Sequence, residues 1–217
     1  MVSRPGREEV AGAKFAKEKR ESALKPLNAH PPEGIEEGGA PDLPPELGAA
    51  SGTIRIPELR NIALTPRVQR VIDHPAFQRL RSIRQLGPTH LVYPGAVHTR
   101  FEHSLGVYGC TQWFLLSLLR DPNIASSLTE QDMMTVLAAA LLHDLGHYPY
   151  AHSLEALHLK GQDTPRHEEV GARIIRGEIE ALRGPEPLSE ILARDWEVDP
   201  ERVICICTGN LVRRCVA

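Results

Sequence analysis

The sequence lacks the features that would place the protein in a membrane or in an oxidising compartment. It has no apolar run of the roughly 18 residues that suggest a membrane-spanning helix. Its first 30 residues contain no apolar signal-peptide stretch, and four glutamates among them argue against a transit peptide. Cysteine is scarce: there are four, and the three in the last thirteen positions lack zinc-knuckle spacing. We therefore expect a cytoplasmic protein with reduced thiols and no membrane partner.

A strong net charge is also missing. The formal charge is −3, which argues against a protein that binds nucleic acids or membranes in general. Hydrophobic residues make up 41% and charged residues 24%, as in soluble globular proteins. One stretch departs from this balance, because eight arginines and only three acidic residues lie between Ile54 and His103. Such an excess suits a polyanionic ligand, although a solvated helix face gives the same pattern.

Residues 1–50 differ in composition from the rest of the chain. They contain seven prolines and six glycines, and their apolar residues are too sparse to offset the entropy lost on ordering. We predict a disordered arm over residues 1–50 and a single ordered domain over residues 51–217.

The pattern beyond residue 50 is mostly helical. Apolar spacing and capping signals predict one helix that starts at Pro66 and others over about 77–86, 100–119, 133–142, 151–159 and 167–182. The 133–142 helix follows a capping box at 129–132, and Thr164 is the expected cap of the last one. Only 53–57 and 91–94 are expected to be extended. These features predict an all-α fold.

Histidine and aspartate occur where apolar sequence surrounds them. His143 and Asp144 end the apolar 133–142 helix, where a charged residue is expensive to bury unless it is paired or bound to metal. Neighbouring side chains on a helix diverge, so a further ligand must come from another helix, and His103 is the candidate. Imidazole and carboxylate ligands together suit Mn, Fe, Mg or Zn. The pattern therefore predicts a divalent-metal site.

Several longer sequence motifs make the resemblance to a known family specific. In chain order these strings are Phe77–Arg81, Ile83–Gly87, Tyr93–Ala96, His98–Gly106 and His143–His147. Over about residues 52–205 the sequence resembles the HD phosphohydrolase superfamily, and within it the deoxynucleoside triphosphate triphosphohydrolases. The resemblance implies an HD-domain helical bundle, a homo-oligomer when full length, and a deoxynucleoside triphosphate or related nucleotide as substrate. It also implies that a metal-activated water attacks the α-phosphate and releases deoxynucleoside and triphosphate.

The same resemblance implies roles for individual residues. It makes His103, His143 and Asp144 the metal ligands. Gln85 and Leu86 would line the deoxyribose, and Arg100 would contact the substrate phosphates. The residues implied to act near the α-phosphate are His147, His152, Glu155, His167 and Glu168.

The resemblance fails toward the C-terminus. The family has a fourth metal ligand, an aspartate much further along the chain, and Asp195 and Asp199 lie too close to Asp144 to take its place. We therefore expect a truncated HD domain with partly exposed helix faces and weak activity. Two alternatives stay open. One is an HD phosphohydrolase acting on nucleoside monophosphates, cyclic nucleotides or guanosine alarmones, and the other is an inactive nucleotide-binding protein.

Overall fold

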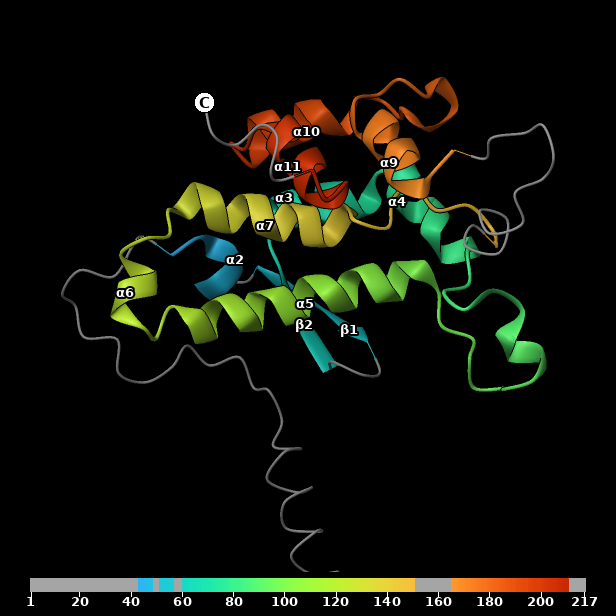
Figure 1. Cartoon of the computed structure of the whole chain (residues 1–217), viewed down its shortest axis with the longest axis horizontal. Coiled ribbons are helices and arrows are strands. Elements are labelled where there is room, and N and C mark those ends of the chain that lie inside the picture. Colours follow the sequence, from blue (N-terminus) through green and yellow to red (C-terminus); the bar gives the residue numbers. More distant parts are fainter. Residues whose placement is uncertain (1–42, 49–50, 57–59, 151–164, 211–217) are drawn as a thin grey trace, which may run out of the picture. The chain divides into compact units, whose positions relative to one another are not determined.

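The computed structural model describes residues 43–48, 51–56, 60–150 and 165–210. These residues are mainly helical, which confirms the all-α prediction. Helices α5 (Arg100–Leu118) and α7 (Glu130–Leu142) lie side by side, joined through the short helix α6 (Pro122–Ala125) (Figure 1). Within the described residues, no helix is long and apolar enough to cross a membrane.

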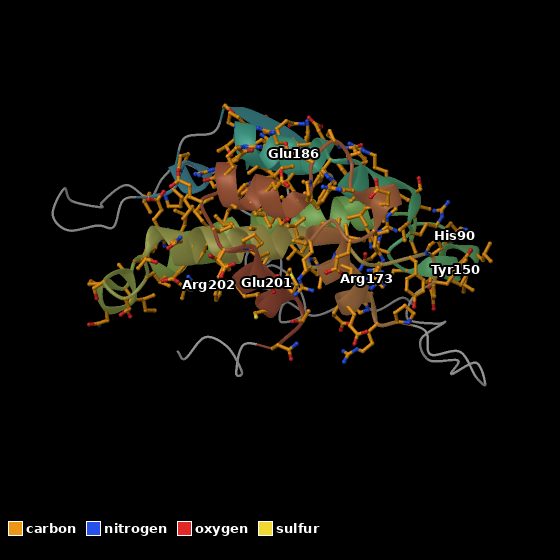
Figure 2. All side chains as sticks on the ribbon, turned by 90° about the horizontal axis from the view of Figure 1, so that it is seen from above. His90, Tyr150, Arg173, Glu186, Glu201 and Arg202 are labelled. Atoms are coloured by element: carbon orange, nitrogen blue, oxygen red, sulfur yellow. The ribbon has the colours of Figure 1, made fainter. Side chains whose placement is uncertain are left out.

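The C-terminal helices cover α7 and the start of the domain. Helix α11 (Pro200–Cys207) packs on α7 and on α9 (His167–Ile175), and α10 (Leu188–Asp195) packs on α3 (Pro66–Asp73). Glu201, labelled in Figure 2, accepts two hydrogen bonds of 2.8 Å from Arg176 just after α9. The core beneath these helices is apolar, and its fully buried side chains include Leu105, Leu137, Leu141, Leu145 and Trp196.

The two central helices start at reciprocal caps. Thr99 and Glu102 form a capping box at the start of α5, and Thr129 and Asp132 form the predicted one at the start of α7. Thr65 caps α3, whose first residue is Pro66, as predicted. Local sequence therefore fixes where the helices that carry the site begin.

The N-terminal part contains the only sheet in the described residues. Strand β1 (Gly52–Ile56) agrees with the extended segment predicted at 53–57 and pairs antiparallel with β2 (Arg60–Leu64). The second strand was not predicted, because Ile62, Ala63 and Leu64 form a continuous apolar run that shows no clear alternation of apolar and polar positions.

The predicted disordered arm extends too far at its C-terminal end. Residues 45–48 form the short helix α2 (Pro45–Gly48), in which Glu46 is buried. Its carboxylate accepts hydrogen bonds from Nε and Nη2 of Arg67 at 2.6 and 2.7 Å and from Thr65 Oγ1 at 2.6 Å. These partners follow about 20 positions later, so composition alone could not reveal them. The rest of the arm, residues 1–42, lies outside the described residues.

The helix predicted over 77–86 is wrong in its second half. Helix α4 (Pro75–Gln78) passes into the 3-10 turn η1 (Arg79–Ser82), and Ile83 is extended. Arg84 then bridges to Thr99, while the Arg100 N–H donates to Ile83 O at 2.8 Å. Pairing with the residues before α5 therefore replaces the helical hydrogen bonds that the apolar spacing suggested.

Two further local predictions are wrong, and a third lies outside the described residues. The segment 91–94, predicted to be extended, contains the last residue of the 3-10 turn η2 (Gly87–Leu91) and turn residues after it. Helix α9 ends at Ile175, short of residue 182, and Gly177 follows with φ 76° before the 3-10 turn η3 (Glu180–Leu182). The helix predicted over 151–159 lies outside the described residues.

Candidate metal centre

The three predicted metal ligands lie together where α5 and α7 meet. His103 is in the first turn of α5, and His143 and Asp144 directly follow the last residue of α7. One ligand atom from each of the three lies within 4.8 Å of the others. The packing of two helices thus brings together residues forty positions apart in the sequence.

The two histidines approach opposite oxygens of Asp144. His143 Nε2 is 3.4 Å from Asp144 Oδ1, and His103 Nε2 is 3.7 Å from Asp144 Oδ2. The aspartate is buried, whereas about a third of each histidine side chain is exposed. His143 Nδ1 lies 2.9 Å from the carbonyl oxygen of Ala140, which only accepts hydrogen bonds, so Nδ1 carries the proton. This leaves the Nε2 lone pair of His143 available for an ion.

The electrostatic environment favours the protonation states that a metal requires. Burial lowers the pKa of His103 and outweighs the opposing effect of Asp144. Burial raises the pKa of Asp144, but His143, His147, Arg100 and His103 together bring it below its ordinary value. Neutral imidazole and ionised carboxylate are the ligand forms of these side chains. The donor set therefore fits a divalent ion such as Mn, Fe, Mg or Zn.

Asp195 and Asp199 do not belong to this cluster. The Asp195 carboxylate pairs with Arg70 at 3.0 Å and with Arg194 at 2.9 Å. Asp199 is the N-cap of α11 and accepts from the Glu201 N–H at 2.9 Å. Within the described residues, His103, His143 and Asp144 are the only group of three or more such side chains arranged to hold an ion.

Two of the predicted catalytic histidines stack beside the cluster. His147 is buried, with Nδ1 3.3 Å from Asp144 Oδ1, and its ring centroid lies 3.8 Å from that of His167. His167 is the first residue of α9, and Glu168 follows with Oε2 3.5 Å from His167 Nδ1. Burial raises the pKa of Glu168, but a backbone N–H together with His167 and Arg166 brings it below its ordinary value. Successive contacts therefore connect Asp144 through His147 to His167 and Glu168 at the start of α9.

Helix α9 begins directly after Arg166, whose side chain makes no capping hydrogen bond. Thr164, the predicted cap, and the predicted catalytic residues His152 and Glu155 lie outside the described residues.

Gly146 explains how α9 approaches the turn after α7. A Cβ placed on Gly146 would lie 1.9 Å from the His167 carbonyl oxygen and 2.3 Å from the Gly171 nitrogen. The backbones at Gly146 and Gly171 can approach so closely only because neither residue carries a side chain. This contact sets the distance between His147 and His167.

Two arginines, the partly buried Arg79 and the buried Arg100, hold the same turn. Arg79 donates from Nη2 to Leu145 O at 2.6 Å and from Nη1 to His147 O at 2.7 Å. Arg100 donates from Nη1 to Asp144 Oδ2 at 2.7 Å. Both belong to the arginine-rich stretch of the sequence. Part of that positive charge therefore lies inside the protein and binds the turn.

The predicted sugar-contacting residues lie beside the start of α5. The Gln85 N–H donates to His98 O at 3.1 Å, and Leu86 is about half exposed. The Gln85 Oε1 is buried and accepts no hydrogen bond from the described residues. A Cβ on Gly87 would lie 3.4 Å from the ring of Tyr150, which is labelled in Figure 2 near His90. Tyr150, which follows His143 and Asp144 in the chain, thus reaches the Gln85–Gly87 segment.

An apolar groove runs along α5 from His103. Its volume is about 810 Å³, and its exposed walls include Trp113, Phe114 and Val136. The expected exposed apolar face is therefore present on the 100–119 helix, whereas most apolar residues of the 133–142 helix are buried and Val136 is its exposed one.

Comparison with known proteins agrees with this geometry. Residues 100–195 match the HD domain family. This segment, which contains His103, His143, Asp144 and the two neighbouring histidines, is therefore similar to HD domains.

The resemblance to the triphosphohydrolase branch is also confirmed. The chain is 43% identical over 118 residues to the deoxynucleoside triphosphate triphosphohydrolase SAMHD1 of Danio rerio, covering 53% of this chain and 19% of the relative. It is 36% identical over 154 residues to SAMHD1 of Homo sapiens, covering 70% and 24%. An uncharacterised protein of Mycoplasma pneumoniae, the MG461 homolog, is 37% identical over 144 residues, covering 64% and 31%. The chain thus spans less than a third of the length of each relative.

Proposed function

We propose that this protein is a metal-dependent phosphohydrolase of nucleotides, with deoxynucleoside triphosphates as its substrate class. The observation that carries the proposal is the continuous arrangement of His103, His143 and Asp144 with the stacked pair His147 and His167. Similarity to SAMHD1 supports the choice of substrate class.

His103, His143 and Asp144 would hold the divalent ion. When bound, such an ion supplies a water of lowered pKa and polarises a phosphoryl oxygen. Mn, Fe, Mg and Zn all fit this donor set. The exposed parts of the two histidines leave an open side at which a phosphate can approach.

The histidines beside the cluster would transfer protons and lie next to the negatively charged phosphate. His147 contacts Asp144 on one side and the His167 ring on the other, so it can orient His167. His167 occupies the N-terminus of the nine-residue helix α9, where the helix dipole favours a phosphate anion. We assign His167 the transfer of a proton at the phosphate, with Glu168 as its acidic neighbour. His152 and Glu155 are proposed to join this catalytic group.

The sugar would lie against Gln85 and Leu86. The buried Gln85 Oε1 is a hydrogen-bond acceptor in need of a donor, and a sugar hydroxyl would supply one. The exposed Leu86 side chain offers an apolar contact.

Product analysis tests the proposal. The purified chain is incubated with each deoxynucleoside triphosphate and MnCl₂, and the products are separated by anion-exchange chromatography. We expect deoxynucleoside and triphosphate in equal amounts, and no product when EDTA is present. The rate should be low, because the described residues supply three metal ligands. Deoxynucleoside monophosphate with pyrophosphate, or turnover of cyclic nucleotides or guanosine alarmones alone, would contradict the assigned substrate and bond.

A His167→Ala variant separates catalysis from metal binding. Because His167 is assigned to proton transfer and not to ligation, single-turnover hydrolysis should fall by about 100-fold or more. Bound Mn, measured by elemental analysis, should stay at the wild-type level. Arg173→Ala, an exposed position on the same helix (Figure 2), is the matched control. An unchanged rate in His167→Ala would remove this residue from the reaction.

A further inference from the structure

Helix α5 presents an apolar stripe to solvent in the described part of the chain. The stripe contains Val107, Trp113 and Phe114, and 54% of Trp113 and 60% of Phe114 are exposed. These side chains line the groove along the helix, with Ile56 of β1 and Val136 of α7 at its borders. A contiguous apolar surface of this kind marks an interaction site.

The stripe is self-complementary about Cys110. Gly106 and Val107 lie one helical turn before this residue, and Trp113 and Phe114 lie one turn after it. The first pair is the smaller and lines the groove, whereas the second pair is bulky and exposed. In an antiparallel pairing of two α5 helices centred on Cys110, the aromatic pair of each copy lies over the Gly106–Val107 pair of the other. A two-fold axis makes these two contacts identical.

We propose that the groove along α5 binds α5 of a second copy of this chain, in an antiparallel dimer centred on Cys110. Gly106, Cys110 and Phe114 form a ridge with the four-residue spacing that packed helices use most often. Glycine lets the two backbones approach closely, and large aromatic side chains contribute most to such contacts. The polar residues His103 and Ser117 lie seven positions on either side of Cys110, so they face each other at the rim.

The size of the contact and a competing surface define the experiment. A contact of one helix per copy is at the small end of specific interfaces, so the dimer should dissociate on dilution. The competing surface includes Leu91 and Tyr93, which are 78% and 66% exposed. They lie at the end of η2 and after it, away from a regular helix face. Leu91→Ser is therefore the matched control.

Sedimentation velocity of the 217-residue chain over a dilution series is the first test. Wild type should change from dimer to monomer. Trp113→Ala removes a bulky contact from both copies and should weaken dimerisation by about 100-fold or more. Gly106→Phe places new bulk against the aromatic pair and should weaken it as much. The double variant exchanges bulk and space across the interface, so it should recover at least about 10-fold of the lost affinity. Leu91→Ser should match wild type.

Two further measurements report the contact in the unaltered chain. The protein has two tryptophans, and Trp196 is buried in the core, so a change of emission on dilution reports Trp113. Cys110 is exposed, and a short bismaleimide should link two Cys110 thiols into a covalent dimer. Cys110→Ser should abolish that product, and an equal yield from this variant would overturn the centring on Cys110.

Other outcomes would also overturn the proposal. A chain that stays monomeric at every concentration would leave the groove to a partner other than a second copy. A series of species larger than a dimer would exclude a contact that closes at two chains. A dimer that Leu91→Ser disperses and Trp113→Ala leaves intact would place the interface on the competing surface.

Discussion

A His143→Ala variant is expected to lose divalent-metal binding almost completely. His143 contributes one of the three ligand atoms in the cluster, and its Nε2 is oriented by the hydrogen bond from Nδ1 to Ala140 O. Removing a direct ligand should lower affinity by more than the roughly 10- to 100-fold typical of an outer partner. Elemental analysis of the dialysed protein and calorimetric titration with MnCl₂ measure the change.

The control is His90→Ala. His90, labelled in Figure 2, contacts Gly87 O through its ring nitrogen and lies outside the cluster. This variant should retain wild-type metal content. Equal metal content in His143→Ala and wild type would show that the ion, if bound, lies elsewhere.

The same titration should depend on pH in a defined direction. Burial lowers the pKa of His103, so its neutral form persists to lower pH than in an unperturbed histidine. Protons compete with metal for imidazole only when the pH falls through the histidine pKa. Affinity should therefore be maintained from neutral pH down to about 6.5, the ordinary histidine value, and decline below it.

The grouping of His103, His143 and Asp144 could be predicted in part, because local sequence sets the two helices that bring these residues together. The capping boxes that start α5 and α7 are readable from Thr99, Glu102, Thr129 and Asp132. Once the starts of those helices are known, the longer sequence strings around His103 and His143 identify the residues that lie together where α5 and α7 meet. The stacking of His147 and His167 adds a contact that the resemblance implied only as shared proximity to a phosphate.

The contacts that hold the site were not visible in the sequence. An arginine that binds two backbone carbonyls has the same local pattern as one on a solvated face, so Arg79 was placed in a basic stretch without a role. The extended pairing of Arg84 with Thr99 also overrode an apolar spacing that favoured a helix through Leu86. In both cases the decisive partners lie far along the chain.

Gly146→Ala is expected to be the most destabilising of the changes considered. Its Cβ would lie 1.9 Å from the His167 carbonyl oxygen and 2.3 Å from the Gly171 nitrogen, both backbone atoms. A flexible side chain could move aside, but here the whole start of α9 must shift. The loss should therefore exceed the 1–3 kcal/mol usual for overpacking and reach about 4 kcal/mol or more.

Two other glycines give a graded comparison. A Cβ on Gly171 would lie 3.3 Å from the Gly146 nitrogen, so Gly171→Ala should cost an intermediate amount. A Cβ on Gly109 would meet the Ile62 side chain at 3.2 Å, which can adjust. Because alanine is favoured over glycine inside a helix by about 0.5–1 kcal/mol, Gly109→Ala should be nearly neutral.

Urea unfolding of the three variants measures this order directly. The expected ranking of the losses in unfolding free energy is Gly146→Ala, then Gly171→Ala, then Gly109→Ala. A Gly146→Ala protein that fails to fold agrees with that ranking, and Gly171→Ala then remains the measurable test. If Gly146→Ala were as stable as Gly109→Ala, the turn after α7 and the start of α9 could not be in backbone contact. The stacking of His147 on His167 would then lose its structural basis, because the backbone contact of Gly146 with α9 is what brings His167 to the predicted metal ligands.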